Sequence, residues 1–167
     1  MLEGLDTRLL VDLLRDRMNP SKALGQHYLV DDEVIERSIR LTEEFASPLS
    51  TDSHVLEVGP GPGSLTLALL RSQSRVTAIE IDKQSVEHLD RVFRESKESL
   101  DIEEADAVSE RWPEGITHII SNLPYQISSP IVDRITKYHS SEPIQLSILL
   151  VQEEFAQRMA MFSAPYD

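Results

Sequence analysis

Hydrophobic and polar positions follow two alternating periods from residue 54 onward. Short apolar runs, typical of buried strands, predict strands over 54–58, 76–80, 101–105, 116–121 and 146–151. Between them, apolar residues recur every three or four positions and predict helices over 64–71, 83–96, 130–138 and 152–162. Strands and helices that take turns in this way are typical of a mostly parallel sheet with helices on both faces. The predicted fold class is therefore α/β.

Two more helices are predicted before the first strand. Residues 5–17 place leucines on one stripe and predict an amphipathic helix. Asp31 or Asp32 can cap a second helix that runs to about Ala46. The stretch between them, NPSKALGQHYLVDD, has the glycine and proline content of a loop.

Unusual residues follow four of the predicted strands at the point where each strand ends. In a sheet of this kind ligands bind beyond the carboxyl ends of the strands, so these residues are the candidate site. They are the glycine loop Gly59-Pro60-Gly61-Pro62-Gly63 with Glu57 before it, Glu80-Ile81-Asp82, Asp106, and Asn122-Leu123-Pro124-Tyr125.

The glycine loop is a poor phosphate cradle. A loop that holds a pyrophosphate needs free backbone N–H groups, whereas Pro60 and Pro62 have none. Ser64 also stands where the third glycine of a dinucleotide-binding fingerprint would fall. Close approach of a backbone with few donors suits a nucleoside or an amino-acid moiety instead. The alternative is a tight turn into a helix that Ser64 caps.

The two acids after strands two and three suit a nucleoside. Glu80 lies about 20 residues beyond the glycine loop, where an acid can accept hydrogen bonds from both ribose hydroxyls. Asp106 can accept a hydrogen bond from the exocyclic amine of an adenine. The alternative for each is a solvated acid at a strand end.

The run Asn122 to Tyr125 suits a flat base that bears an amine. The lone pair of such an amine is delocalised into the ring, which makes it a poor nucleophile. Hydrogen bonds from its N–H groups to the Asn122 carboxamide oxygen and to a main-chain carbonyl held out by Pro124 would restore nucleophilicity. Tyr125 would stack on the base, as aromatic side chains do on flipped bases. The alternative is a strand-end turn with Tyr125 packed in the core.

Composition narrows the setting without choosing the function. The 167-residue chain has no cysteine, which excludes a disulfide framework and a thiolate metal site. We expect no bound metal. Because no leader of signal type and no 18-residue apolar run is present, we also expect a cytoplasmic protein without membrane attachment. The net charge of −13 gives nucleic-acid binding no support, so any such function must rest on the motifs.

Six segments in the same order resemble one enzyme family. They are NPSKALGQHYLVD, VLEVGPGPGSLT, AIEID, EADA, SNLPYQISSPI and LLVQEEFAQRM, which together run from Asn19 to Met159. In this form and order they resemble the ribosomal RNA small-subunit adenine dimethyltransferases, which use S-adenosylmethionine. The form QEEFAQRM is closer to the archaeal and eukaryotic branch of that family.

The resemblance implies a class I methyltransferase fold of Rossmann-like type and a role for each motif. Residues 1–30 would form an N-terminal helix and a loop that covers the cofactor, and residues 31–167 the methyltransferase domain. The target adenine would lie against Asn122, Leu123, Pro124, Tyr125 and Phe155. The cofactor would contact Gln26, His27, Leu29, Glu57, Gly59, Gly61, Gly63, Glu80, Ile81, Asp106, Ala107 and Asn122. His27 stands where many relatives have asparagine, and we assign it no proton transfer.

The implied reaction is dimethylation of the exocyclic amines of two adjacent adenosines in small-subunit ribosomal RNA, on the immature subunit. The family's domain continues into further strands and a helical RNA-binding domain, whereas this sequence stops at MFSAPYD. We therefore expect the N-terminal catalytic portion, able to bind the cofactor but weak or inactive in methylation. Two rival interpretations are another adenine or glutamine amine methyltransferase and a nicotinamide-dependent oxidoreductase.

Overall fold

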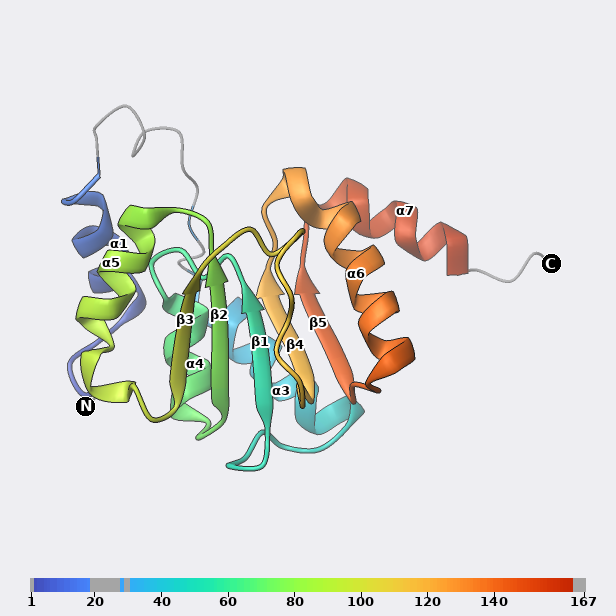
Figure 1. The fold of residues 1–167 in the computed structure, drawn as a ribbon, viewed down its shortest axis with the longest axis horizontal. Coiled ribbons are helices and arrows are strands. Elements are labelled where there is room, and N and C mark those ends of the chain that lie inside the picture. The colour runs from blue at the N-terminus through green and yellow to red at the C-terminus, as the bar shows by residue number, and fades with distance from the viewer. Residues whose placement is uncertain (1, 19–27, 29–30, 164–167) are drawn as a thin grey trace.

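A computed structural model describes residues 2–18, 28 and 31–163. Within these ranges the strands are β1 (His54–Val58), β2 (Arg75–Glu80), β3 (Leu100–Glu104), β4 (His118–Asn122) and β5 (Leu146–Leu150). They form one parallel sheet in the order β3-β2-β1-β4-β5, which Figure 1 shows from left to right. The predicted α/β class and parallel sheet are confirmed.

The helices connect and flank these strands. They are α1 (Thr7–Arg15), α3 (Asp32–Phe45), α4 (Ser64–Arg71), α5 (Lys83–Val92), α6 (Ser128–Ser141) and α7 (Glu153–Ser163), with short 3₁₀ turns at Arg94–Ser96 and Tyr125–Ile127. None of the helices in the described part of the chain is long and apolar enough to cross a bilayer.

Side chains from alternate positions of the strands build a core on each face of the sheet. Val55 and Ile120 point to the face that α1, α3, α4 and α5 cover. Leu56 and Ile119 point to the opposite face, where α6 and the connection 105–117 cover them. Figure 1 shows α3 and α4 behind the sheet and the connection crossing in front of it. Successive apolar residues of the inner strands β1 and β4 thus supply both buried faces, whereas the edge strand β3 contributes only to the first.

Aspartate side chains cap three of the described helices, α1, α3 and α5. Asp31 caps α3 by accepting from the backbone N–H groups of Glu33 and Val34, so the first of the two predicted capping residues is the one used. The helix α4 begins differently, because Gly63 occupies its cap position and Ser64 makes no capping hydrogen bond. The alternative in which Ser64 caps this helix is therefore wrong.

Candidate functional site

The strand order reverses between β1 and β4, and a parallel sheet opens at such a place. The two strands pair at Val55 with His118 and at Leu56 with Ile119, whereas β1 stays paired with β2 as far as Val58. β4 likewise stays paired with β5 through Asn122. The carboxyl ends of the two central strands therefore part from each other while their outer neighbours hold them.

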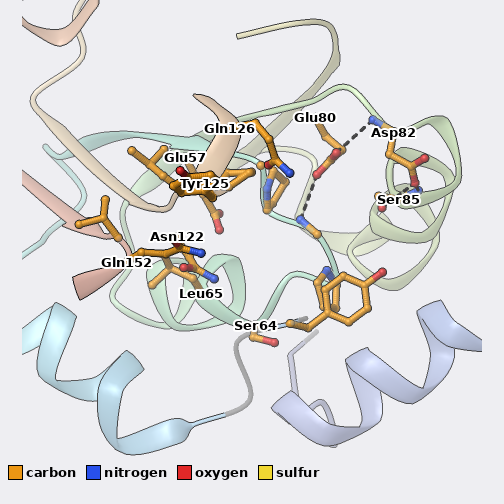
Figure 2. Close-up of a pocket in the computed structure, with 18 residues that line it drawn as sticks. Glu57, Ser64, Leu65, Glu80, Asp82, Ser85, Asn122, Tyr125, Gln126 and Gln152 are labelled. Carbon is orange, nitrogen blue, oxygen red and sulfur yellow. Dashed lines mark hydrogen bonds between the residues drawn. The ribbon is translucent and has the colours of Figure 1, made fainter. Parts of the chain in front are cut away.

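A cavity of about 670 Å³ lies where the carboxyl ends of β1 and β4 separate. Residues that follow β1, β2, β4 and β5 surround it, and Figure 2 shows their side chains converging on one space. The lining residues are Tyr28, Glu57, Gly59, Pro60, Gly61, Pro62, Ser64, Leu65, Glu80, Asp82, Ser85, Asn122, Leu123, Pro124, Tyr125, Gln126, Val151 and Gln152. The glycine loop and Asn122 therefore share one hollow.

The backbone N–H groups of the glycine loop are used inside the protein. Gly59 donates to the Ile79 carbonyl at 2.9 Å, and Gly63 donates to the Pro60 carbonyl at 3.0 Å. Gly61 donates to the Glu80 carboxylate at 3.0 Å, as the dashed line in Figure 2 shows. Since the two prolines carry no N–H, residues 59–63 have no donor left for a phosphate.

A buried histidine supports the loop from α5. The His88 ring is fully buried, and its Nε2 lies 2.8 Å from the Pro62 carbonyl oxygen. Burial lowers the pKa of His88, so the neutral ring donates from Nε2 to that carbonyl. The sequence analysis did not single out His88, because a lone histidine on a helix carries no signal of what its ring meets.

Three carboxyl groups face the cavity, and none of its described lining residues is Lys or Arg. Glu80 is 7% exposed, and its carboxylate accepts hydrogen bonds from the backbone N–H groups of Gly61 and Asp82. Asp82 also caps α5 through Ser85. The site is thus electrostatically prepared for a ligand that carries positive charge.

Glu57 is the most deeply placed of these acids. It is 2% exposed, and the Thr66 hydroxyl donates to its carboxyl group at 2.6 Å. Burial raises the pKa of Glu57 to about 8, the nearby charge of Glu80 adds to the rise, and the hydrogen bond from Thr66 opposes it. A cation brought into the cavity would favour the ionised form.

The run from Asn122 to Tyr125 forms the opposite wall. Asn122 ends β4 half-buried on the cavity, while Leu123 is buried and donates its backbone N–H to the Leu150 carbonyl. The Tyr125 side chain is 56% exposed and lies at the cavity. The alternative in which Tyr125 packs in the core is therefore wrong, and its ring is available to a ligand.

The segment predicted to cover the cofactor is described at one position. The Tyr28 ring lines the cavity near Gly61, where an added Cβ would lie 3.6 Å from the ring. Burial raises the pKa of Tyr28 to about 12, and its hydroxyl donates to the Met18 sulfur at 3.0 Å. Gln26, His27 and Leu29 lie outside the described residues.

Five of the predicted ligand residues do not line this cavity. Gly63 packs on α5, the Ile81 side chain is 68% exposed, and the exposed Asp106 accepts from the backbone N–H of Val108. Ala107, in the connection 105–117, is buried in the core, and Phe155 lies half-buried on α7. Their proposed contacts with ligands stay predictions.

Several lining residues were missed by the sequence analysis. Ser85 and Gln126 lie one to three residues beyond segments that were singled out, and Val151 and Gln152 follow β5, whose end was not singled out. They could have been identified from the sequence because they follow strands whose carboxyl ends lie at the same edge of the sheet. The amides of Gln126 and Gln152 add hydrogen-bonding groups on the side of Asn122 and Tyr125 (Figure 2).

In the described ranges no three His, Cys, Asp or Glu side chains gather closely enough to hold a metal ion.

The model of the family described as ribosomal RNA adenine dimethylase matches residues 17–164. This chain belongs to that family. The resemblance predicted from the six motifs is confirmed, while the finer assignment to the archaeal and eukaryotic branch stays a prediction.

Relatives in this adenine dimethylase family are similar over most of the chain. A probable ribosomal RNA small subunit methyltransferase A from Thermococcus gammatolerans is 37% identical over 152 residues, which is 91% of this chain and 50% of the relative. One from Haloarcula marismortui is 44% identical, over 85% of this chain and 47% of the relative. This chain therefore spans about half the length of the curated relatives it matches.

A solved structure supports the same family fold. The dimethyladenosine transferase from Plasmodium falciparum superposes with a TM-score of 0.68 at 27% identity, over 80% of this chain and 46% of the other. The Rossmann-like methyltransferase fold predicted for this chain is confirmed.

Proposed function

We propose that this chain carries the methyl-transfer site of a ribosomal RNA adenine dimethyltransferase, which binds S-adenosylmethionine and methylates two adjacent adenosines of small-subunit RNA. The observation that carries the proposal is the single cavity shared by the glycine loop, Glu80 and Asn122. Membership of the dimethylase family supports it independently of the geometry.

The lining of the cavity fits S-adenosylmethionine better than a dinucleotide. The ligand has a positive sulfur and an ammonium group against one carboxylate, and the cavity presents Glu57, Glu80 and Asp82 with no described Lys or Arg. NAD would instead bring a pyrophosphate to a loop whose N–H groups are all used. Glu57 and the loop would hold the methionine portion, and Glu80 the ribose.

The chain's own residues position the target amine. S-adenosylmethionine would supply a methyl group that its positive sulfur already activates, and the neutral thioether S-adenosylhomocysteine would be the product. Asn122 accepts a hydrogen bond from the amine and keeps its lone pair aimed into the cavity. Tyr125 stacks on the base, a contact that contributes about 1–3 kcal/mol per base.

Deprotonation needs no dedicated base. The nitrogen becomes strongly acidic when its lone pair forms the new bond, and its proton passes to water at the open mouth beside Tyr125. Most of the rate enhancement then comes from holding the two reactants in line and from excluding water between them.

Calorimetric titration of the chain with S-adenosylmethionine and, separately, with NAD tests the ligand. We expect binding of the first and no detectable binding of the second. Binding of NAD alone would contradict the proposal and support the oxidoreductase.

Methyl transfer to different acceptors tests the substrate. A version of the protein with the length of its relatives should methylate immature small ribosomal subunits and leave duplex DNA and protein acceptors unmodified. A preference for DNA or for protein glutamine would contradict the proposed substrate and support another amine methyltransferase.

A further inference from the structure

The parting of β1 and β4 is bridged by a side chain where the backbone ladder stops. Beyond the pair Leu56 and Ile119, the backbone N–H of Val58 donates at 2.8 Å to the Ser121 hydroxyl oxygen. Val58 is 1% exposed and Ser121 is fully buried. A parallel ladder would join these strands through backbone carbonyls, whereas here a hydroxyl takes the place of the carbonyl.

The bridge immediately precedes the two walls of the cavity. Val58 is followed by Gly59, which opens the glycine loop, and Ser121 is followed by Asn122. On the outer sides each wall is fixed to its own neighbour. Gly59 donates to the Ile79 carbonyl of β2, and Leu123 donates to the Leu150 carbonyl of β5.

We propose that the Ser121 hydroxyl is a spacer that sets the separation between the cofactor loop and the Asn122 carboxamide, which makes Ser121 a positioning residue for methyl transfer. This inference rests on the proposed function, because it concerns the distance between the two ligands of the same cavity. Ser121 itself does not line the cavity, so it would act through the neighbouring residues that do.

The physical reason is that the two half-sheets lack a backbone tie at this level. The pairs β2–β1 and β4–β5 are each continuous to their ends, so the hinge of the site lies between β1 and β4. Replacing Ser121 by alanine leaves the buried N–H of Val58 without its acceptor. The strands then close up or admit water, and either change moves Asn122 relative to Gly59.

A bisubstrate compound tests the spacing in the chain itself, whether or not that chain turns over. The probe joins N6 of adenosine by a short alkyl linker to a 5′-amino analogue of S-adenosylhomocysteine, so that it spans both halves of the cavity. Its affinity is compared with that of S-adenosylhomocysteine, which occupies the cofactor half alone. A misplacement of about 1 Å can cost about 100-fold in rate, so the spanning probe should respond strongly.

We expect Ser121→Ala to weaken the bisubstrate compound about tenfold or more and S-adenosylhomocysteine about twofold or less, since geometry matters only to the ligand that spans the gap. Ser121→Thr, which keeps the hydroxyl, should restore most of the affinity. The matched control is Ser74→Ala, because Ser74 is also fully buried and its hydroxyl donates to the Leu69 carbonyl away from the cavity. It should leave both affinities unchanged.

The outcomes separate the spacer from the proposed function. If the unmodified chain binds the bisubstrate compound no more tightly than S-adenosylhomocysteine, the proposal that both ligands share this cavity is contradicted. The proposed role of Ser121 is then contradicted as well. If the unmodified chain prefers the bisubstrate compound but Ser121→Ala weakens both ligands equally or neither, the spacer alone is overturned.

A second measurement covers the case in which Ser121→Ala does not fold. Hydrogen exchange of the Val58 amide in the unmodified chain should be as slow as that of the Leu56 amide in the same strand. Fast exchange at Val58 would overturn the bridge directly.

Discussion

The carboxamide of Asn122 is the side chain on which the proposed chemistry depends most directly. It lies at the last position of β4, where the strand delivers it half-buried to the cavity. An amide at this place accepts hydrogen bonds without adding charge, so it can steer an amine without protonating it. A carboxylate could accept as well, but it would add a fourth acid to the cavity.

Asn122→Ala should lower the rate of methyl transfer at saturating substrate by about 100- to 1000-fold, the range seen when one positioned hydrogen-bonding group is removed. Affinity for S-adenosylmethionine should fall only slightly, because the cofactor loses one predicted contact and keeps the loop and Glu80. Single-turnover kinetics in a version with the length of its relatives, together with calorimetry, measures both. Gln126→Ala is a matched control that removes an exposed amide from the same wall. Equal losses in the two variants would contradict the role given to Asn122.

Glu57 makes a separate prediction about pH. Its pKa in the folded protein, about 8, lies above the ordinary value of 4.5. The folded state therefore holds this proton more tightly than the unfolded state, and its contribution to stability is complete below about pH 4.5. That contribution is lost as pH rises to about 8, by up to about 1.4 kcal/mol per pH unit.

Urea denaturation of Glu57→Gln at pH 5 and pH 8 measures this linkage. Glutamine stays neutral and keeps an oxygen for the Thr66 hydroxyl. The free energy of unfolding of Glu57→Gln should therefore increase relative to that of the unmodified chain as pH rises. Thr66→Val removes the hydrogen bond that favours the carboxylate, so the decline should extend to higher pH. A difference between Glu57→Gln and the unmodified chain that does not change with pH would contradict the raised pKa.

The helix α4 and the loop before it depend on a glycine for packing. Gly63 has a φ of 96°, and an added Cβ would lie 2.6 Å from Phe93 Cε2 and 2.9 Å from Leu89 Cδ2 on α5. The glycine that closes the loop thus permits close contact between α4 and α5. This contact explains why Gly63 belongs to the motif without lining the cavity.

Gly63→Ala should lower the free energy of unfolding by about 2–5 kcal/mol, the sum of left-handed backbone strain and overpacking. Gly115→Ala is the matched control, because Gly115 has a φ of 77° but nothing within 4 Å of an added Cβ. It should cost only the strain, about 1–2 kcal/mol. Chemical denaturation of both variants checks the difference, and equal losses would show that packing against Phe93 is unimportant.

At the level of elements, periodicity predicted the strands and helices within a few residues, because β1, β2 and β4 are apolar runs buried on both faces and the helices that cover the sheet turn an apolar stripe to it. The helix predicted over 83–96 ends earlier, at Val92, and a 3₁₀ turn follows it. The helix predicted from Pro130 begins at Ser128, where the Ser128 hydroxyl donates to the Pro124 carbonyl. Local hydrogen bonds of this kind leave no periodic signal.

The sequence could not supply the order of the strands, and the site depends on that order. Residues after β1, β2, β4 and β5 reach the cavity, whereas Asp106 follows β3 at the sheet edge. β3 lies two strands from β1, a separation of about 10 Å. The prediction that residues after each strand form one site is therefore confirmed for the strands near the reversal of strand order between β1 and β4, and not for β3.

The hydrogen bond between Val58 and Ser121 could not be predicted from the sequence either. Its importance comes from a partner 63 residues away in the chain, which no local pattern reveals. Serine before the amide resembles an ordinary strand residue until the register of β1 and β4 is known.

At the level of the whole molecule, the negative net charge favours one ligand of the proposed reaction and opposes the other. The net charge of −13 opposes binding to RNA, and no described residue at the cavity is Lys or Arg. A small cationic cofactor is attracted by the same charge. The two ligands of the proposed reaction thus make opposite electrostatic demands on this chain.

We expect residues 1–167 to bind S-adenosylmethionine but to bind small-subunit RNA weakly, with little dependence on salt because few phosphates are neutralised. Methylation of immature subunits by this chain should be slow or absent. Fluorescence anisotropy at several salt concentrations and transfer of a labelled methyl group measure the two quantities. Robust dimethylation by residues 1–167 would contradict this expectation.

Every backbone N–H group in residues 59–63 already donates a hydrogen bond within the protein, and this limits which inhibitors can bind the loop. Adding a phosphate to a lead compound gains no donor at this loop and places a negative group beside Glu57 and Glu80. Medicinal chemistry here should favour phosphate-free nucleosides that carry a basic amine. Selectivity over enzymes that bind ATP or NAD would then follow from the backbone itself.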